Sequence, residues 1–397
     1  MQNGQFRVMQ VVSNLDIGGA QEVVRTLAEH LAYAGCSAVV CAFKDGPLRQ
    51  EIERRGIPVE ILPDRRYSVV AFPLFIMDML RLRRALLEVV SRHQINVIQT
   101  HLLRSLDFLV LTLRYGRNLL VFWTVQNARL TLREDHLRRH KWLLGPKQLA
   151  YRLLYRLAAR WVNGFIAVSD EVKMAIVDTI GPVQDKITVI CNSVDVRRYQ
   201  QPVDTARVRR QLGLAQDARL MAVVATFKTQ KGHRYLIEAA PSLVSEFPDL
   251  HILFIGDGDL REELQAQTRA LGLDAHIHYL GSRNDVSDLL AASDYFVLPS
   301  LWEGLSMALV EAMASGLPII ATEVSGTKQV MVAGETGLLV APGNAQQLKE
   351  AIMQLLSEPA RARAMALAAQ RRVEAFSAKK QAADHIALYR REWNGSG

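Results

Sequence analysis

The sequence is poor in cysteine, in aromatic residues and in long apolar runs. Its three cysteines, Cys36, Cys41 and Cys191, form neither a disulfide framework nor a CxxC metal pattern, which favours a reducing compartment. The most apolar run, residues 68–80, is interrupted by Pro73 and is shorter than the roughly 20 residues that a spanning helix needs. The first residues lack the layout of a signal peptide. We therefore expect a cytoplasmic protein without a transmembrane segment.

Charge is unevenly distributed along the chain. The formal net charge is +8, and the basic excess belongs to the first half. It is densest between Arg129 and Arg160, where arginines stand beside leucines, tyrosines and tryptophans at helical spacing. Two interpretations stay open: a pair of solvated helices, or a surface for anionic lipid headgroups that makes the protein peripheral at the cytoplasmic face of the membrane. Nucleic acid is not an expected partner, because no recognition motif is present and only 7% of residues are aromatic.

Length and periodicity predict two α/β domains. A chain of 397 residues is long for one hydrophobic core, so two domains of roughly 200 residues each are expected. Short β-branched runs alternate with amphipathic helical stretches in both halves, which indicates parallel sheets covered on both faces. The expected strands lie at 7–12, 38–43, 95–100, 220–226, 251–256, 276–280, 295–300, 317–322 and 336–340. Ligands of such sheets bind at the carboxyl ends of the strands, here in a cleft between the two domains.

The stretch LPSLWEGLSMALVEAMASGLPII, residues 298–320, places two glutamates in an otherwise apolar setting. A helix is expected between Ser306, which can cap it, and Gly316, which can end it. Glu311 lies inside this helix and Glu303 lies in the loop before it. Because an unpaired buried carboxylate is costly, Glu311 needs a partner, and a ribose diol that donates two hydrogen bonds to one carboxylate would suit it.

Two further loops follow expected strands. In SNLDIGGAQ, the pair Gly18 and Gly19 lets backbone approach a ligand at a helix N-terminus, although a glycine pair there can also be an ordinary turn. In VATFKTQKGH, Lys228 and Lys231 precede a helix start at Gly232. A lysine at that place can neutralise a phosphate or can simply be a solvated loop residue, and the loop alone does not decide between the two.

Taken in order, these motifs resemble those of the retaining family 4 glycosyltransferases with the GT-B fold. The resemblance rests on the two glutamates followed by AMASGLPIIATEVSGTKQVMVAGETGLLVAPGN, and on LDIGGAQEVV, FIAVSDEV, ITVICNSVD, QKGH, FIGDGD and HYLG. It covers nearly the whole chain. It implies an acceptor-binding Rossmann-like domain at 1–195, a nucleotide-sugar-binding one at 196–375, and a final helix at 376–397 that returns to the first.

The family implies an enzyme that moves a sugar from a UDP- or GDP-linked donor to an acceptor hydroxyl with retained anomeric configuration. The resemblance would make Glu303, Lys231 and His101 catalytic, with Glu303 on the donor sugar and Lys231 on the diphosphate. Glu311 would bind the ribose. The implied donor-binding residues are Gly18, Gly19, Thr226, Lys228, Lys231, Gly304, Leu305, Ser306, Met307 and Glu311. His101 and Gln126 would lie on the acceptor side, although a histidine at that place can also be structural.

The sequence departs from the family pattern at several positions. Thr226 stands where the family often has arginine, so diphosphate neutralisation depends more on Lys231. Gln126 stands where many members have histidine, which puts a catalytic role there in doubt. Ser193 replaces a common glycine, and the pair Leu305 and Ser306 replaces a frequent phenylalanine and glycine.

No cofactor and no catalytic metal are expected. The GDGD loop, residues 256–259, offers an Asp-x-Asp pair of the kind that holds a divalent cation on a sugar diphosphate in a different glycosyltransferase fold. Here a lysine and a helix N-terminus are available to stabilise the leaving diphosphate instead. The route that the family implies is a front-face substitution in which the leaving phosphate accepts the proton of the acceptor.

A glycan or glycolipid acceptor in cell-surface polysaccharide or lipopolysaccharide assembly fits the basic first half. Two alternatives share the architecture. A non-hydrolysing nucleotide-sugar epimerase would bind the same donor and release an isomer. A non-catalytic nucleotide-sugar-binding protein would keep the pocket for regulation.

Overall fold

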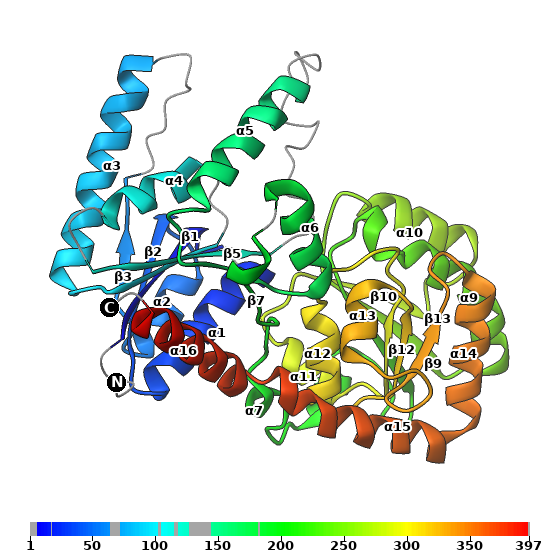
Figure 1. The fold of residues 1–397 in the computed structure, drawn as a ribbon. Helices are drawn as coiled ribbons and strands as arrows, with labels where there is room; N and C mark the ends of the chain where they lie inside the picture. The colour runs from blue at the N-terminus through cyan, green and yellow to red at the C-terminus, as the bar shows by residue number, and fades with distance from the viewer. Residues whose placement is uncertain are drawn as a thin grey trace. The chain divides into compact units, whose positions relative to one another are not determined.

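The computed structural model divides the chain into two compact units (Figure 1). It describes residues 6–16, 18–63, 72–101, 105–114, 118–126, 144–181 and 183–395. Unit 1 comprises residues 1–193 and 378–397, and unit 2 comprises residues 194–377. The divisions drawn from the sequence, after residues 195 and 375, lie two residues away from these.

Unit 1 contains a seven-stranded parallel sheet with the strand order β3-β2-β1-β4-β5-β6-β7. Its strands are β1 (Arg7–Asn14), β2 (Ser37–Lys44), β3 (Val59–Ile61), β4 (Val97–Thr100), β5 (Leu120–Val125), β6 (Gly164–Ala167) and β7 (Ile187–Val189). The order reverses between β1 and β4, which makes the carboxyl edge of these two strands the switch point where ligands of open parallel sheets bind.

Helices cover both faces of this sheet, because successive side chains of a strand point to opposite faces. In β1, Met9 and Val11 pack in one core cluster while Val8 and Val12 pack in the other. The helices are α1 (Gly19–Tyr33), α2 (Leu48–Arg54), α3 (Phe72–Arg92), α4 (Ser105–Leu111), α5 (Leu144–Ala158), α6 (Asp170–Ile180) and α16 (Ala378–Asn394), with 3-10 turns at Thr112–Arg114 and Gln184–Lys186.

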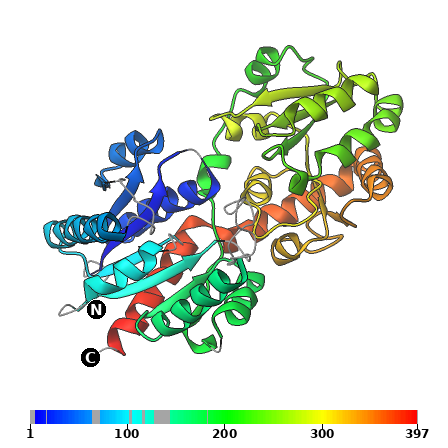
Figure 2. The same ribbon diagram turned by 90° about the horizontal axis from the view of Figure 1, so that it is seen from above.

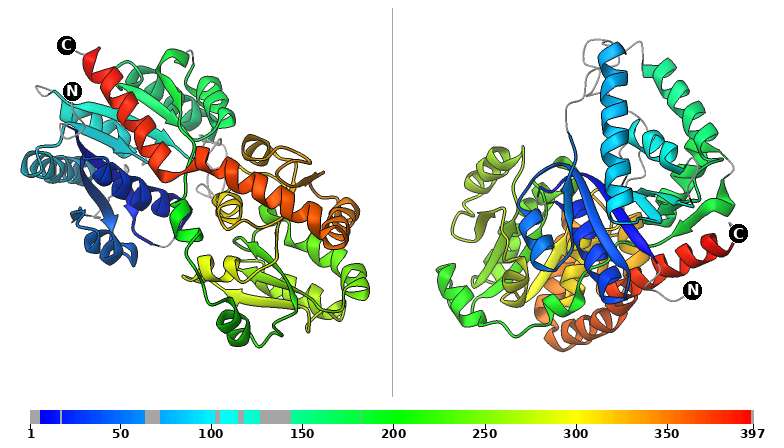
Figure 3. Two further views of the ribbon diagram at one scale, coloured as in Figure 1. Left: turned by 90° about the horizontal axis from the view of Figure 1, so that it is seen from below. Right: turned by 90° about the vertical axis from the view of Figure 1, so that its left-hand side faces the viewer.

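The last helix, α16, belongs to unit 1 although it follows unit 2 in the chain. Figure 3 (left) shows it in red beside α1, and it also contacts β5. Its apolar face buries Ile386 and Tyr389 against Val8 and Phe122 of the sheet. Through these contacts the last helix packs on the sheet of unit 1.

Unit 2 contains a six-stranded parallel sheet with the strand order β10-β9-β8-β11-β12-β13 and helices on both faces (Figure 2). Its strands are β8 (Arg219–Val224), β9 (Leu250–Ile255), β10 (Ile277–Gly281), β11 (Tyr295–Leu298), β12 (Ile319–Thr322) and β13 (Leu338–Val340). Its helices are α7 (Val196–Tyr199), α8 (Thr205–Gln211), α9 (His233–Glu246), α10 (Arg261–Ala270), α11 (Val286–Ala291), α12 (Met307–Ala314), α13 (Ser325–Val330), α14 (Ala345–Ser357) and α15 (Pro359–Arg372), with 3-10 turns at Thr229–Lys231 and Val373–Phe376.

The predicted fold class, two Rossmann-like parallel-sheet domains, is confirmed. All nine strands expected from β-branched runs are present, and the structure adds β3, β5, β6 and β7 in unit 1. In β5 all six residues are buried, so its sequence LVFWTV lacks the alternation that marks a half-exposed strand. Among the described residues, no helix has the length and apolar character needed to cross a membrane.

Candidate active site

In unit 2, the loops after β8 and β11 are held together at the carboxyl edge of the sheet. These two strands are neighbours, so their following loops meet. The amide of Leu301 donates to the carbonyl of Gln230 at 2.7 Å, and the Gln230 side chain donates to the carbonyl of Trp302 at 2.9 Å. Gly232 has φ +65°, and a Cβ there would lie 1.9 Å from the carbonyl oxygen of Pro299. Only glycine allows this close approach of the two loops.

The same two loops bring Lys231 and Glu303 together. Nζ of Lys231 donates to Oε1 of Glu303 at 2.5 Å, and Oγ of Ser300 donates to the same oxygen at 2.7 Å. The side chain of Glu303 is 6% exposed and that of Lys231 is 19% exposed. A buried carboxylate needs such partners. An ammonium carries three donors, so Lys231 keeps donors for an anionic ligand while it holds Glu303.

Helix α12 begins at Met307, as expected, but the side chain of Ser306 does not cap it. Instead Ser306 is buried, and its carbonyl accepts from the amide of Val310. Gly316, with φ +71°, ends the helix as the sequence predicted. Glu311 is half-buried and lies in the second turn.

Gly304 and Leu305, which precede this helix, are also half-buried. Gly326 at the start of α13 was not singled out from the sequence, although a Cβ there would lie 1.3 Å from the carbonyl oxygen of Gly304. Its absent side chain lets α13 pack directly against the loop that carries Glu303.

The remaining expected donor residues lie after the ends of strands β8 and β1. Thr226 and Lys228, after β8, are exposed. Gly18 precedes α1 in unit 1 and Gly19 begins it, after β1, and the space where a Cβ of Gly19 would stand is open. Gly19 therefore leaves backbone accessible at the carboxyl edge of unit 1, whereas a Cβ at Gly18 would lie 2.7 Å from Oε1 of Gln21.

His233 follows the lysine loop and is not among the site residues expected from the sequence. It is 2% exposed, and among the described residues neither ring nitrogen has a hydrogen-bond partner. Its ring packs edge-on against Phe227 and Phe254. Burial, followed by the nearby charge of Lys231, lowers the pKa of His233 to about 4, so this histidine is neutral at physiological pH.

The GDGD loop is engaged within the protein. Oδ1 of Asp257 accepts from the amide of Gly258 at 2.8 Å, and Oδ2 pairs with Arg261 at 3.0 Å. A Cβ at Gly258 would lie 2.6 Å from the carbonyl oxygen of Phe227, so the glycine serves loop packing. Over the described ranges, no group of three histidine, cysteine, aspartate or glutamate side chains is arranged to hold a metal ion.

In unit 1, His101 and Gln126 come together with two residues that the sequence did not point to, Gln10 and Asn192. Nε2 of His101 lies 2.7 Å from Oε1 of Gln10, and Nδ1 lies 3.4 Å from Nε2 of Gln126. Nδ2 of Asn192 donates to Oε1 of Gln126 at 2.9 Å. Burial lowers the pKa of His101 to about 3. The histidine is therefore neutral, with both ring nitrogens bonded.

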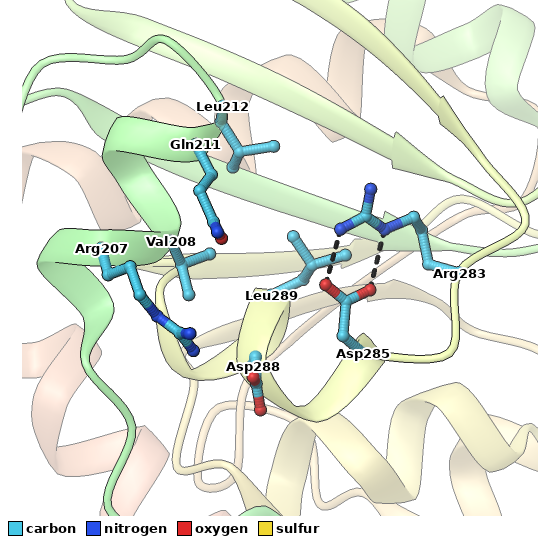
Figure 4. Close-up of a pocket in the computed structure, with 8 residues that line it drawn as sticks. All are labelled: Arg207, Val208, Gln211, Leu212, Arg283, Asp285, Asp288 and Leu289. Atoms are coloured by element: carbon cyan, nitrogen blue, oxygen red, sulfur yellow. Dashed lines mark hydrogen bonds and ion pairs between the residues drawn. The ribbon is translucent and has the colours of Figure 1, made fainter.

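A pocket of about 490 Å³ lies elsewhere in unit 2, between α8 and the start of α11 (Figure 4). Arg283 and Asp285 form two hydrogen bonds with each other at its wall. It shares no residue with the loops that carry Lys231 and Glu303, so it is not part of the candidate active site.

The predicted basic surface from Arg129 to Arg160 falls partly outside the described residues, at 129–143. The described part is α5 and the turn after it. Arg156 donates to the carbonyl of Ile180 at 2.7 Å and so helps attach α5 to α6. Arg152 and Arg160 are exposed.

Two Rossmann-like units with parallel sheets of seven and six strands are the architecture of the GT-B class of glycosyltransferase folds. The model named Glycosyltransferase Family 4 matches residues 17–198, and the model named Glycosyl transferases group 1 matches residues 204–372. The chain belongs to glycosyltransferase family 4.

Solved structures share this fold at low sequence identity. HepE from Anabaena in complex with UDP is similar over 96% of this chain and 100% of that one, with a TM-score of 0.78 and 22% identity. WaaG, a glycosyltransferase involved in lipopolysaccharide biosynthesis, is similar over 96% of this chain and 99% of that one, with a TM-score of 0.70 and 18% identity.

Curated relatives include a UDP-Gal:alpha-D-GlcNAc-diphosphoundecaprenol alpha-1,3-galactosyltransferase from Escherichia coli. It is 31% identical over 197 residues, which are 49% of this chain and 51% of the relative. A D-inositol 3-phosphate glycosyltransferase from Corynebacterium urealyticum is 24% identical over 422 residues, covering 94% of this chain and 91% of the relative. The chain thus spans about half the length of the first of these relatives and nearly all of the second.

Proposed function

We propose that this protein is a retaining hexosyltransferase that moves a sugar from a nucleoside diphosphate donor to a hydroxyl group of a glycan or glycolipid. The observation that carries the proposal is the buried pair of Lys231 and Glu303 between two loops at the carboxyl edge of the unit 2 sheet. The pair joins a cation suited to a diphosphate and a carboxylate suited to sugar hydroxyls within 2.5 Å.

The chemistry of transfer uses each member of this pair. Departure of the nucleoside diphosphate builds negative charge on its β-phosphate, and preorganised donors there stabilise the transition state. Lys231 is already held in place by Glu303, so it does not need to be ordered when the diphosphate leaves. Oε1 of Glu303 accepts from Lys231 and Ser300. Oε2, to which no described side chain donates, is the oxygen that would accept from a donor-sugar hydroxyl.

The donor is a UDP- or GDP-linked sugar. HepE, which shares the fold, was crystallised with UDP and with UDP-glucose. A relative from Corynebacterium glutamicum is named as a GDP-mannose-dependent mannosyltransferase. In this chain the half-buried Glu311 on α12 would accept hydrogen bonds from the ribose hydroxyls, which both kinds of donor carry.

A lipid-linked acceptor agrees with the names of relatives and with one surface of unit 1. The galactosyltransferase above acts on a diphosphoundecaprenol-linked sugar by its name, and another relative is named as a lipopolysaccharide core mannosyltransferase. Helices α3 and α5 lie on the same side of the unit 1 sheet (Figure 1). Their exposed apolar side chains are Ile76, Met77, Leu80, Leu149, Leu153, Leu154 and Leu157. Exposed arginines on both helices, among them Arg84 and Arg152, complement an anionic membrane surface.

Incubation with labelled nucleotide sugars separates this proposal from its alternatives. A panel of UDP- and GDP-sugars is first tested for thermal stabilisation, since a ligand at 100 times its dissociation constant adds about 2.7 kcal/mol. The stabilising donor is then incubated with a membrane lipid extract. Label that moves into the lipid fraction supports a transferase. Label recovered in an isomeric nucleotide sugar identifies an epimerase, and unchanged donor that still binds identifies a non-catalytic binding protein.

A further inference from the structure

We propose that Oδ1 of Asn192 is the accepting atom of a subsite for a sugar hydroxyl group, and that the C-terminal helix α16 fixes its orientation through a chain of buried hydrogen bonds. This inference rests on the proposed function, because it assigns a binding position at Asn192 to a hydroxyl group of the donor sugar or of the acceptor. The chain runs from His385 on α16 through Gln99, Gln10, His101 and Gln126 to Asn192.

The donor and acceptor at each step of this hydrogen-bond chain are fixed by a contact within α16. Nδ1 of His385 lies 2.8 Å from the backbone carbonyl oxygen of Gln381. A carbonyl oxygen only accepts, so Nδ1 of His385 carries the proton. The ring is fully buried, and burial lowers its pKa to about 4. Nε2 of this neutral ring is therefore an acceptor.

Each amide along the chain then has one possible orientation. Gln99 must donate its Nε2 to Nε2 of His385, at 3.2 Å, so its Oε1 faces the other way. That oxygen accepts from Tyr389 at 2.5 Å and from Nε2 of Gln10 at 3.3 Å. Oε1 of Gln10 consequently faces His101. The backbone carbonyl of Gln381 thus determines the orientation of both amides.

The second half of the chain follows in the same way. Nε2 of His101 lies 2.7 Å from Oε1 of Gln10 and must donate to it. Nδ1 of the neutral ring then accepts from Nε2 of Gln126. Oε1 of Gln126 accepts from Nδ2 of Asn192. The atom left at the end of the chain is Oδ1 of Asn192, and no other assignment avoids placing two acceptors or two donors against each other.

Oδ1 of Asn192 is buried and accepts no hydrogen bond from any described residue, and the residue is 8% exposed. A buried acceptor without a donor destabilises the folded protein, so a ligand that supplies one gains affinity there. His101, Gln126 and Asn192 follow the carboxyl ends of β4, β5 and β7, the edge at which parallel sheets bind ligands. A hydroxyl group is the donor that a sugar offers.

The same chain gives His101 a positioning role. Both of its ring nitrogens are bonded, one as donor to Gln10 and one as acceptor from Gln126. A general base needs a free nitrogen within reach of the proton it takes. His101 therefore acts through Gln126 on the orientation of Asn192.

Nitrogen NMR of the full-length protein labelled with nitrogen-15 shows which ring nitrogen of each histidine carries the proton. It therefore tests the donor and acceptor assignments of the hydrogen-bond chain without any ligand. At pH 7 we expect His101 with its proton on Nε2 and His385 with its proton on Nδ1. A proton on Nδ1 of His101 would reverse Gln126 and Asn192, so that Asn192 would present a donor instead of an acceptor. That result overturns the proposal.

Kinetics of Asn192→Ala test the subsite, with the stabilising donor and a membrane lipid extract as the acceptor probe. We expect the extract concentration at half-saturation to rise roughly 2- to 12-fold, the range of one neutral hydrogen bond, with the dissociation constant of UDP unchanged. A rise in the KM of the donor sugar instead assigns the hydroxyl to the donor and still supports the subsite. Unchanged values for both substrates overturn it.

Asn163→Ala is the matched control. Oδ1 of Asn163 accepts from the amide of Val121 at the amino end of the same sheet, so this variant loses an asparagine hydrogen bond far from the carboxyl edge. For Asn163→Ala we expect a lower melting temperature and an unchanged extract concentration at half-saturation. If both variants change that concentration equally, the role of Asn192 is merely structural and the proposal is overturned. Should the unmodified protein bind UDP but transfer nothing, the proposed function fails, while the histidine tautomers still decide the direction of the chain.

Discussion

The pair of Lys231 and Glu303 gives a stability prediction with a definite asymmetry. Removing one partner of a buried ion pair leaves an uncompensated charge, at a cost of about 3–5 kcal/mol. In Lys231→Met the stranded charge is Glu303, whose side chain is only 6% exposed. Ser300 still donates to it, so we expect a loss near the low end, about 3 kcal/mol.

Glu303→Gln should lower the free energy of unfolding by less than Lys231→Met does. The stranded Lys231 is 19% exposed and its long side chain can move its charge toward water, so we expect a loss of about 1–2 kcal/mol. The double variant carries no stranded charge. Its loss should therefore fall short of the sum of the single losses by about 2 kcal/mol, within the range measured for contacting residues.

Urea unfolding of the full-length variants measures these free energies. Lys228→Met is the matched control, because Lys228 lies three residues away, is exposed and should change the free energy of unfolding by less than about 0.5 kcal/mol. If the losses of the two single variants add within about 0.5 kcal/mol, the ion pair does not couple the two loops, and the reasoning is refuted.

Four further outcomes are expected. Glu311→Gln should fold and weaken UDP binding by roughly 10- to 150-fold, the value of a charge-assisted hydrogen bond, with near-normal binding in Glu303→Gln. Normal calorimetric affinity in a folded Glu311→Gln would mean that Glu311 does not bind the ribose. Burial lowers the pKa values of His101 and His385 to about 3 and about 4, so as pH falls below about 6.5 these two histidines gain protons only in the unfolded chain. The free energy of unfolding should then decrease by on the order of 1–2 kcal/mol per histidine between about pH 6.5 and 5, and a flat profile in urea titrations contradicts neutral histidines. Transfer activity should survive saturating EDTA, whereas complete loss restored by Mn²⁺ would establish a catalytic metal. Binding to anionic vesicles, measured by flotation, should weaken steeply with salt and in Leu153→Glu on α5. It should not weaken in Met174→Glu on α6, where the replaced side chain is at least as exposed. Equal binding to neutral vesicles removes the lipid proposal.

Much of the unit 2 site could be predicted from the sequence because its parts are local. The apolar run before residue 299 predicts a buried strand, and Gly316 predicts the end of α12 at its positive φ. Lys231 and Glu303 stand out because charged residues follow buried strands. Ser300 and Gly326 gave no such signal. Their roles depend on which carboxyl group or carbonyl lies next to them.

The sequence by itself determined the parallel-sheet architecture and the loops that follow its strands, since apolar periodicity and glycine spacing are properties of neighbouring residues. Only the tertiary structure decided which loop residues meet. Lys231 and Glu303 are 72 residues apart, and Gln99 and His385 are 286 apart. Periodicity places Gln10 and Gln99 inside strands, but not on adjacent strands in one register. The sequence also does not show which atoms donate and which accept in the hydrogen bonds that reach Asn192. The backbone carbonyl of Gln381, at the other end of that series of hydrogen bonds, determines this.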